Sequence, residues 1–204
     1  MNTTLAEICT NKEFTMRKLV LSVITIILTT LAIVMFIYFY PKKVNINAQG
    51  IKYRLGTELL ESEKLVNVNI EGKLYKNIFG ERKFEGTIDI AGEEIPVPLD
   101  QRKLNILITN EGWGAINYPY FKYRKEDNAT ESSHNYQYGS LVINNDFTKV
   151  TILVSDQNQL KDNSGIGWNS ERGQMITAPA SSRIEAISIT NEISEKFLKG
   201  LRLK

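Results

Sequence analysis

One uninterrupted apolar stretch, from Leu19 to Tyr40, constrains this chain more than any other feature. It contains no charged residue, glycine or proline, and Pro41 follows it directly. As a helix rising about 1.5 Å per residue, it would span roughly 33 Å, enough to cross the hydrocarbon core of a bilayer. We therefore predict a short tail over residues 1–18, a transmembrane helix over residues 19–40 and a linker over residues 41–49.

A cleaved signal peptide explains this stretch less well. The apolar region of a signal peptide is about 7–15 residues long and leads to small residues at a cleavage site. Here bulky residues from Met35 to Tyr40 occupy that place. A lipoprotein signal would need a cysteine at the exit of the apolar run, and the single cysteine, Cys9, lies before it. Tyr38 and Tyr40 also suit the aromatic belt at a membrane interface.

Length predicts the orientation better than charge does. Basic residues flank both ends of the span, so the excess of positive charge expected on the cytoplasmic side does not decide it. A short N-terminal tail, one span and a large C-terminal domain form the usual signal-anchor arrangement, which also leaves Cys9 in the reducing cytosol. We predict a single-pass protein of the cell membrane with an extracytoplasmic C-terminal domain and the bilayer as its partner through residues 19–40.

Charge and size limit what the domain beyond the span can be. About 160 residues remain after Lys43, enough for one domain whose core needs no disulfide or metal. The chain has 25 basic and 23 acidic residues, and the two kinds are nearly balanced once the basic residues around the span are set aside. Nucleic acid is therefore not an expected partner, because phosphate binding requires a clustered basic excess.

From Gly50 onward, apolar and polar residues alternate with period two, and turn residues interrupt the pattern roughly every ten residues. This pattern is typical of antiparallel β structure. We expect a turn at Glu71-Gly72, and Pro96 and Pro98 place their segment at a sheet edge or in a loop. The predicted strands are residues 66–70, 74–79, 84–90, 104–109, 114–123, 136–143, 150–155 and 174–177.

The pattern changes to a helical period after Pro179. Ala186, Ile189, Ile193 and Phe197 fall in one apolar stripe, which predicts an amphipathic helix over residues 180–200 that packs on the sheet. The predicted fold is thus an N-terminal transmembrane helix followed by a mainly-β domain over residues 50–204. That domain is an antiparallel meander that curls into a sandwich or open barrel and is closed by the C-terminal helix.

Two long polar loops interrupt the strands, Arg124–Asn135 and Asp156–Ser170. The two strands between these loops form a hairpin through a turn at Asn144-Asn145-Asp146. The first loop precedes this hairpin and the second follows it, so both loops lie at its open end. We therefore expect the two loops to be neighbours. Long loops carry function more often than short turns do.

Aromatic residues near these loops are the best candidates for a binding site. Flat rings beside polar loops suit the face of a sugar or a protein partner, because they offer a large contact area at a low cost in entropy. Alternation along the strands predicts that about half of these rings belong to the core. The candidate ligand-binding residues, expected to converge on a shallow groove, are Trp113, His134, Tyr136 and Trp168.

The sequence contains no strong catalytic or metal-binding motif, and we predict neither a cofactor nor a metal site. His134 is the only histidine, and Ser132 and Ser133 beside it are weak candidates for a nucleophile. Asp156, Asp162 and Asn163 lack the regular spacing of a calcium loop. The carboxylates that could serve a glycosidase in pairs are Glu93-Glu94, Glu126-Asp127 and Asp156.

Three segments, Gly72–Gly80 (GKLYKNIFG), Phe84–Ile88 (FEGTI) and Ala178–Ala186 (APASSRIEA), carry a resemblance to known sequences. The domain resembles uncharacterised single-span exported proteins of low-GC Gram-positive bacteria. The resemblance covers most of the domain. It implies a location at the membrane and assigns no reaction, cofactor or site residues.

Together these features predict a membrane-anchored, extracytoplasmic binding or accessory module without catalytic activity, with a cell-surface glycan or a protein as its partner. One alternative is a surface hydrolase that uses paired carboxylates. Another is a structural subunit of a membrane complex that associates through small residues of its span, among them Ser22, Thr25 and Thr29.

Overall fold

The computed structural model describes residues 3–56, 63–156 and 167–204, with residues 3–15 described through their backbone alone. The chain forms two compact units that divide after Tyr40. The first unit is one helix, α1 (Thr3–Phe39). Its apolar segment Met16–Phe39 has a mean hydropathy of 2.8, and its length and composition suit a membrane anchor or a signal sequence. The helix begins at Thr3, so residues 3–18 of the predicted tail are helical and continuous with the apolar segment.

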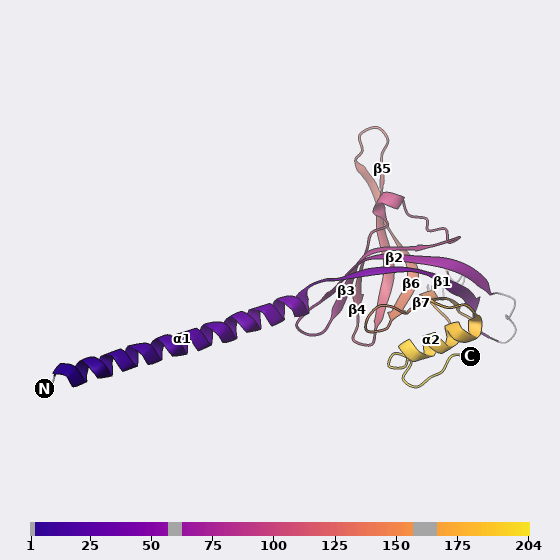
Figure 1. Cartoon of the computed structure of the whole chain (residues 1–204). Coiled ribbons are helices and arrows are strands. Elements are labelled where there is room, and N and C mark those ends of the chain that lie inside the picture. Colours follow the sequence, from indigo (N-terminus) through magenta and orange to yellow (C-terminus); the bar gives the residue numbers. More distant parts are fainter. Residues whose placement is uncertain (1–2, 57–62, 157–166) are drawn as a thin grey trace. The chain divides into compact units, whose positions relative to one another are not determined.

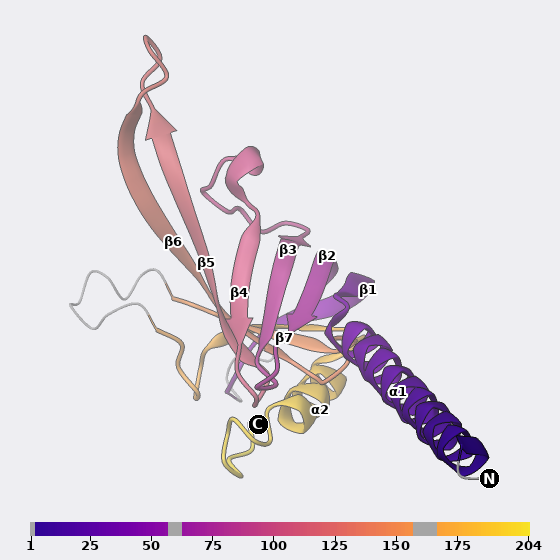
Figure 2. The same ribbon diagram turned by 90° about the vertical axis from the view of Figure 1, so that its left-hand side faces the viewer.

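The second unit is an eight-stranded antiparallel sheet that curls into a nearly closed barrel (Figures 1 and 2). Strands that follow one another in the chain are paired, except β4 and β5, which form the two edges of the sheet. Strand β1 also pairs with β8, so the order across the sheet is β4-β3-β2-β1-β8-β7-β6-β5. The predicted fold class is confirmed. The elements are β1 (Lys42–Arg54), β2 (Lys64–Lys76), β3 (Arg82–Ile90), the 3-10 helix η2 (Leu99–Gln101), β4 (Leu104–Ile108), β5 (Trp113–Tyr123), β6 (Thr130–Ile143), β7 (Val150–Val154), β8 (Gln174–Ala178) and α2 (Arg183–Ile193).

Strand β1 occupies the segment that was expected to be a linker, so the prediction for residues 41–49 is wrong. Val44 and Ile46 alternate with polar residues and are buried inside the barrel, which is the pattern of a half-buried strand. The pairing of β1 with β2 begins at once, with Lys42 opposite Leu74. The barrel therefore starts two residues after Tyr40.

The predicted turn at Glu71-Gly72 is also wrong, because β2 runs unbroken through Gly72. This glycine lies directly opposite Gly86 of β3. A Cβ atom on Gly72 would lie 2.3 Å from the Glu85 carbonyl oxygen and 2.8 Å from the ring of Phe84. Gly72 thus gives the Phe84 ring room within the sheet and does not mark a turn.

Two apolar clusters hold the second unit together. The larger fills the barrel, and the smaller lies between the outer face of the sheet and α2, which contacts β1, β7 and β8. The predicted packing of the C-terminal helix on the sheet is confirmed, but the helix ends at Ile193 instead of residue 200. Beyond it the chain turns back, with Lys199 and Gly200 at positive φ and the Asn191 side chain bonding the backbone of Leu203.

A cluster of four buried hydroxyl groups joins α2 to the sheet. The Oγ1 of Thr190 on α2 lies 2.8 Å from that of Thr151 and 3.0 Å from that of Thr177. It also donates a hydrogen bond to the Ala186 carbonyl at 2.8 Å. The Tyr53 hydroxyl lies 3.3 Å from Thr190 Oγ1 and 3.4 Å from Thr177 Oγ1.

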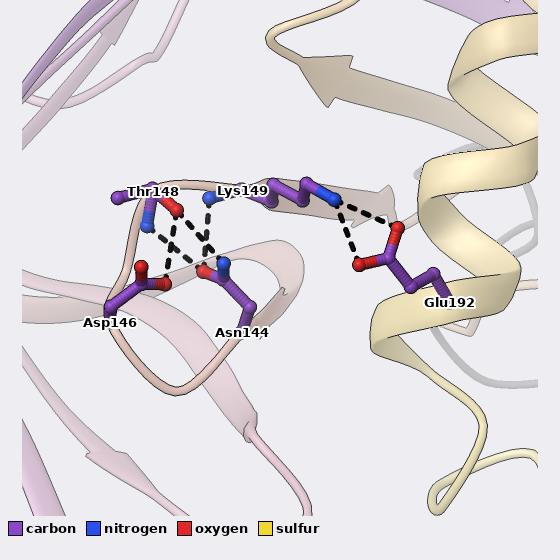
Figure 3. A network of polar contacts seen from close by, with 5 residues as sticks. All are labelled: Asn144, Asp146, Thr148, Lys149 and Glu192. Atoms are coloured by element: carbon purple, nitrogen blue, oxygen red, sulfur yellow. Dashed lines mark hydrogen bonds and ion pairs between the residues drawn. The ribbon is translucent and has the colours of Figure 1, made fainter.

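The turn between β6 and β7 is organised by Asn144 and linked to α2 (Figure 3). The Asn144 carboxamide oxygen accepts hydrogen bonds from the backbone N–H groups of Thr148 and Lys149 at 2.9 and 3.0 Å. The Thr148 hydroxyl donates to Asp146 at 3.0 Å. The Lys149 ammonium then bonds both carboxylate oxygens of Glu192 at 2.8 Å, so the turn and the helix hold each other in place.

The hairpin of β5 and β6 extends beyond the other strands (Figure 2). Residues 130–135, predicted to be loop, belong to β6, and only residues 124–129 form the connection. Strand β7 pairs with β6 only from Gly139 onward. Nine residues of β6, about 30 Å of strand, therefore separate the hairpin tip from the end of β7, and the tip does not adjoin Asp156 or Gly167. Residues 157–166 of the second predicted loop lie outside the described residues.

Candidate functional site

A cavity of about 530 Å³ opens at the end of the barrel where β1, β3 and β7 finish and β8 begins. Its wall combines charged and aromatic side chains from distant parts of the sequence. The most informative of these are Arg54, Glu93, Tyr136, Tyr138, Trp168 and Arg172. The volume lies within the range of about 300–1,000 Å³ that is common for ligand pockets.

The residue pattern of β1 explains why the barrel is open at this end. The inward positions carry Val44 and Ile46 at one end of the strand and Lys52 and Arg54 at the other. Apolar side chains fill the first end, whereas the charged side chains must stay paired or hydrated. The barrel interior therefore changes from a packed core to a polar cavity along one strand.

Glu93 is the centre of the polar contacts in the cavity. Its carboxylate forms an ion pair with Lys52, and the two side chains are only 12% and 21% exposed. It also accepts a hydrogen bond from the Tyr138 hydroxyl at 3.3 Å. Burial raises the pKa of Tyr138, and the Glu93 carboxylate raises it further. Burial and then Glu93 raise the pKa of Tyr136 as well, so both phenols remain hydrogen-bond donors at neutral pH.

The backbone of Gly173 and Gln174 holds the Trp168 side chain at the cavity. Its indole N–H donates to the Gln174 carbonyl at 3.2 Å. The ring lies against Gly173, where an added Cβ would be 2.3 Å from the indole nitrogen. Asn169 shapes the following turn by accepting hydrogen bonds from two backbone N–H groups. The indole is half-buried and not fully enclosed, so part of it remains accessible to a ligand.

The structure brings together two of the four predicted site residues. Tyr136 and Trp168 line the same cavity. His134 does not line the cavity. It is exposed on the β5–β6 hairpin and stacks on Tyr120, with the ring centroids 5.1 Å apart. Trp113 lies at the start of β5 and stacks on Phe197, with the ring centroids 6.2 Å apart. The expectation that all four converge is therefore wrong for His134 and Trp113, because it relied on the two loops being neighbours.

His134 does contact a serine, although outside the cavity. The Ser132 Oγ lies 2.8 Å from the His134 Nε2, because residues two apart on a strand share one face. A catalytic triad would also need a third group to orient the imidazole. Among the residues whose contacts the structure describes, none provides a hydrogen bond to Nδ1 of His134.

Three carboxylates line the cavity: Glu93, Glu94 and Asp156. Of the other predicted carboxylates, Asp127 is at the hairpin tip, where it pairs with Arg124 at 3.0 Å. Asp162 and Asn163, considered for calcium, lie outside the described residues. In the part of the chain with described side chains, no group of three histidine, cysteine or acidic residues could hold a metal ion.

Arg54 and Arg172 line the cavity but are not among the site residues predicted from the sequence. A signal for Arg54 was present, because it continues the inward series of β1 that begins with Val44 and Ile46. A charged residue at a core-facing position points to a cavity or a paired charge. Arg172 sits in an irregular segment before β8, where no periodic pattern assigns a side chain to a face.

No family model, curated protein or solved structure matches this chain. The chemistry of the cavity is therefore the basis for a functional proposal.

Proposed function

We propose that this chain is a single-pass, membrane-anchored module that acts outside the cytoplasm and binds a saccharide in the cavity of its barrel without transforming it. The observation that carries the proposal is the meeting of Tyr136 and Trp168, two partly exposed aromatic rings, with charged groups of both signs in one cavity. Aromatic faces stack on the apolar faces of sugar rings. The neighbouring carboxylates and guanidinium groups can bond the hydroxyl groups.

The two tryptophans of the chain permit a matched test. Trp168 lines the cavity, whereas Trp113 stacks on Phe197 elsewhere. The detergent-solubilised chain is titrated with a panel of monosaccharides and disaccharides while tryptophan emission is recorded. We expect a saturable change that persists in Trp113→Phe and disappears in Trp168→Phe. A change that survives in Trp168→Phe, or no change with any sugar of the panel, would contradict saccharide binding at this cavity.

A hydrolase that uses paired carboxylates is a second candidate, favoured by the presence of Glu93, Glu94 and Asp156 around one cavity. Glu93 is already engaged by Lys52 and Tyr138, which suits a structural role better than proton transfer. Glycosidase activity that is lost in both Glu94→Gln and Asp156→Asn would favour the hydrolase over the binding module.

Association through the span is supported less well. The hydroxyls of Thr25, Thr29 and Thr30 donate to carbonyls of their own helix at 2.8–2.9 Å, so their protons are already used. The proposed orientation is tested by adding protease to intact cells. Digestion of the barrel from outside supports an extracytoplasmic domain, and protection until the cells are opened contradicts it.

A further inference from the structure

The turn between β2 and β3 exposes two large apolar side chains at its tip. Ile78 is 67% exposed and Phe79 is 77% exposed. Isolated apolar side chains are common on protein surfaces, but two adjacent ones at the tip of a turn leave most of their area in water. Their position in the barrel indicates what covers them.

This turn belongs to the end of the barrel at which the chain enters from α1. Lys42, the first residue of β1, pairs with Leu74, and β2 ends only two residues later, at Lys76. By strand geometry, the tip therefore extends roughly 10 Å past the level of Lys42 in the strand direction. Lys42 itself follows Tyr40, the end of the apolar span, by two residues. Chain connectivity alone thus keeps Phe79 close to the bilayer surface if α1 spans the membrane.

Several backbone N–H groups of the turn are bonded within the turn itself. The Asn77 carboxamide oxygen accepts hydrogen bonds from the backbone N–H groups of Phe79 and Glu81 at 3.0 and 2.9 Å. The backbone N–H of Gly80 donates to the Asn77 carbonyl at 3.1 Å. Backbone groups that are already bonded lose little on entering an apolar interface, whereas unpaired groups are costly there. The tip is therefore a compact projection of two apolar side chains, and the exposed Asn77 and Glu81 side chains bond each other at its base at 2.8 Å.

The exposed lysines beside the turn outnumber the one carboxylate of the turn, Glu81, and so favour an anionic surface. Lys42, Lys43 and Lys73 are exposed on the neighbouring ends of β1 and β2, and lysines near a membrane are attracted to anionic headgroups. The other described turns at this end of the barrel are polar at their tips, with Glu111 between β4 and β5 and Asp146 between β6 and β7. The apolar tip is thus confined to the turn beside the strand that follows the span.

We propose that the β2–β3 turn inserts Ile78 and Phe79 into the interface of an anionic lipid bilayer and so holds the barrel against the membrane surface. The proposal rests on the membrane anchor of the proposed function and is independent of the ligand. The cavity lies at the opposite end of the barrel, beyond Arg54 at the end of β1, so membrane contact at this turn leaves the cavity open.

The test uses the full chain with Cys9→Ser, reconstituted in vesicles of phosphatidylcholine and phosphatidylglycerol. An environment-sensitive NBD label is attached through Phe79→Cys. The matched control carries it through Leu99→Cys, a residue that is 80% exposed on η2 at the other end of the barrel. We expect the label at position 79 to shift its emission to shorter wavelengths and to be quenched by brominated lipids, and the label at position 99 to do neither. Ile78→Cys is expected to behave like Phe79→Cys.

An alkaline wash of the vesicles separates failure of the anchor from failure of this inference. A chain that washes off has no membrane anchor, which would overturn both proposals about the membrane. A chain that stays on the vesicles with water-exposed labels at positions 78 and 79 overturns the insertion of the turn alone. A label that is shielded but not quenched by brominated lipids also overturns it, because a protein surface would then cover the turn. None of these three results bears on saccharide binding in the cavity.

Discussion

Replacing Thr190 by valine tests whether the buried hydroxyl cluster fixes α2 on the sheet. Valine keeps the shape of threonine, so the change removes hydrogen bonds without opening a cavity. Thr190 donates its proton to the Ala186 carbonyl and is an acceptor for the groups around it. The cluster therefore loses its main acceptor, and the three remaining hydroxyls must rearrange.

The expected loss in the free energy of unfolding follows from counting the hydroxyl protons that still have an acceptor in each variant. Without Thr190, Thr151 can donate to Thr177 at 3.0 Å and Thr177 can donate to Tyr53 at 3.4 Å, which leaves the Tyr53 proton without an acceptor. A buried polar group without a partner costs about 1–3 kcal/mol. Without Thr151, every proton still finds an acceptor, and the loss should not exceed about 1 kcal/mol. Thr190→Val should therefore destabilise the barrel more than Thr151→Val does.

Denaturant unfolding in detergent, followed by tryptophan emission, measures this difference. Both tryptophans belong to the second unit, so the signal reports the barrel and not α1. Replacing all three threonines by valine and Tyr53 by phenylalanine leaves no unpaired hydroxyl and should recover part of the loss. Equal effects of Thr190→Val and Thr151→Val, or a further loss in the fourfold variant, would refute the proton count.

Two further predictions concern packing and pH. Gly72→Ala places a Cβ 2.3 Å from the Glu85 carbonyl oxygen and should lower the free energy of unfolding by about 1–3 kcal/mol. At Gly167 a Cβ would meet no atom within 4 Å, so Gly167→Ala is the control, and a similar loss there would count against the packing argument. The pKa of Tyr138 is raised above its ordinary value, so the folded state keeps a proton that the unfolded state releases above pH about 10. Stability should fall from that pH upward, by at most about 1.4 kcal/mol per pH unit for this one group, and Tyr138→Phe should make the fall shallower; an unchanged slope would contradict the assignment.

Much of the barrel could be predicted from sequence because strands such as β3 alternate strictly. Phe84, Ile88 and Ile90 of β3 are buried on one face as the alternation requires. The errors occurred where one residue type serves two purposes. Gly72 is typical of a turn, but in β2 it allows close approach of two strands. Polar residues such as Asn135 are typical of a loop, but here they lie on a hairpin whose two faces are largely exposed.

The candidate site was harder to predict than the fold, because it depends on where strands end relative to one another. The convergence of Tyr136 and Trp168 followed from their chain positions beside one hairpin. Excluding His134 required the length of β6, which extends well past its pairing with β7. That length is a property of strand pairing and has no local signature in the residues of the β5–β6 tip.

The charges around the cavity favour some chemical classes of the proposed ligand over others. Arg54 and Arg172 face a wall that also carries three carboxylates, among them Glu93 and Asp156. A strong anion would be repelled by the acids, and a strong cation would compete with Lys52 for Glu93. An uncharged ligand with many hydroxyl groups can bond both signs at once, while the Trp168 ring offers the apolar surface that such a ligand also presents. The balance of charge at this end of β1 therefore favours a neutral sugar over an anionic polymer.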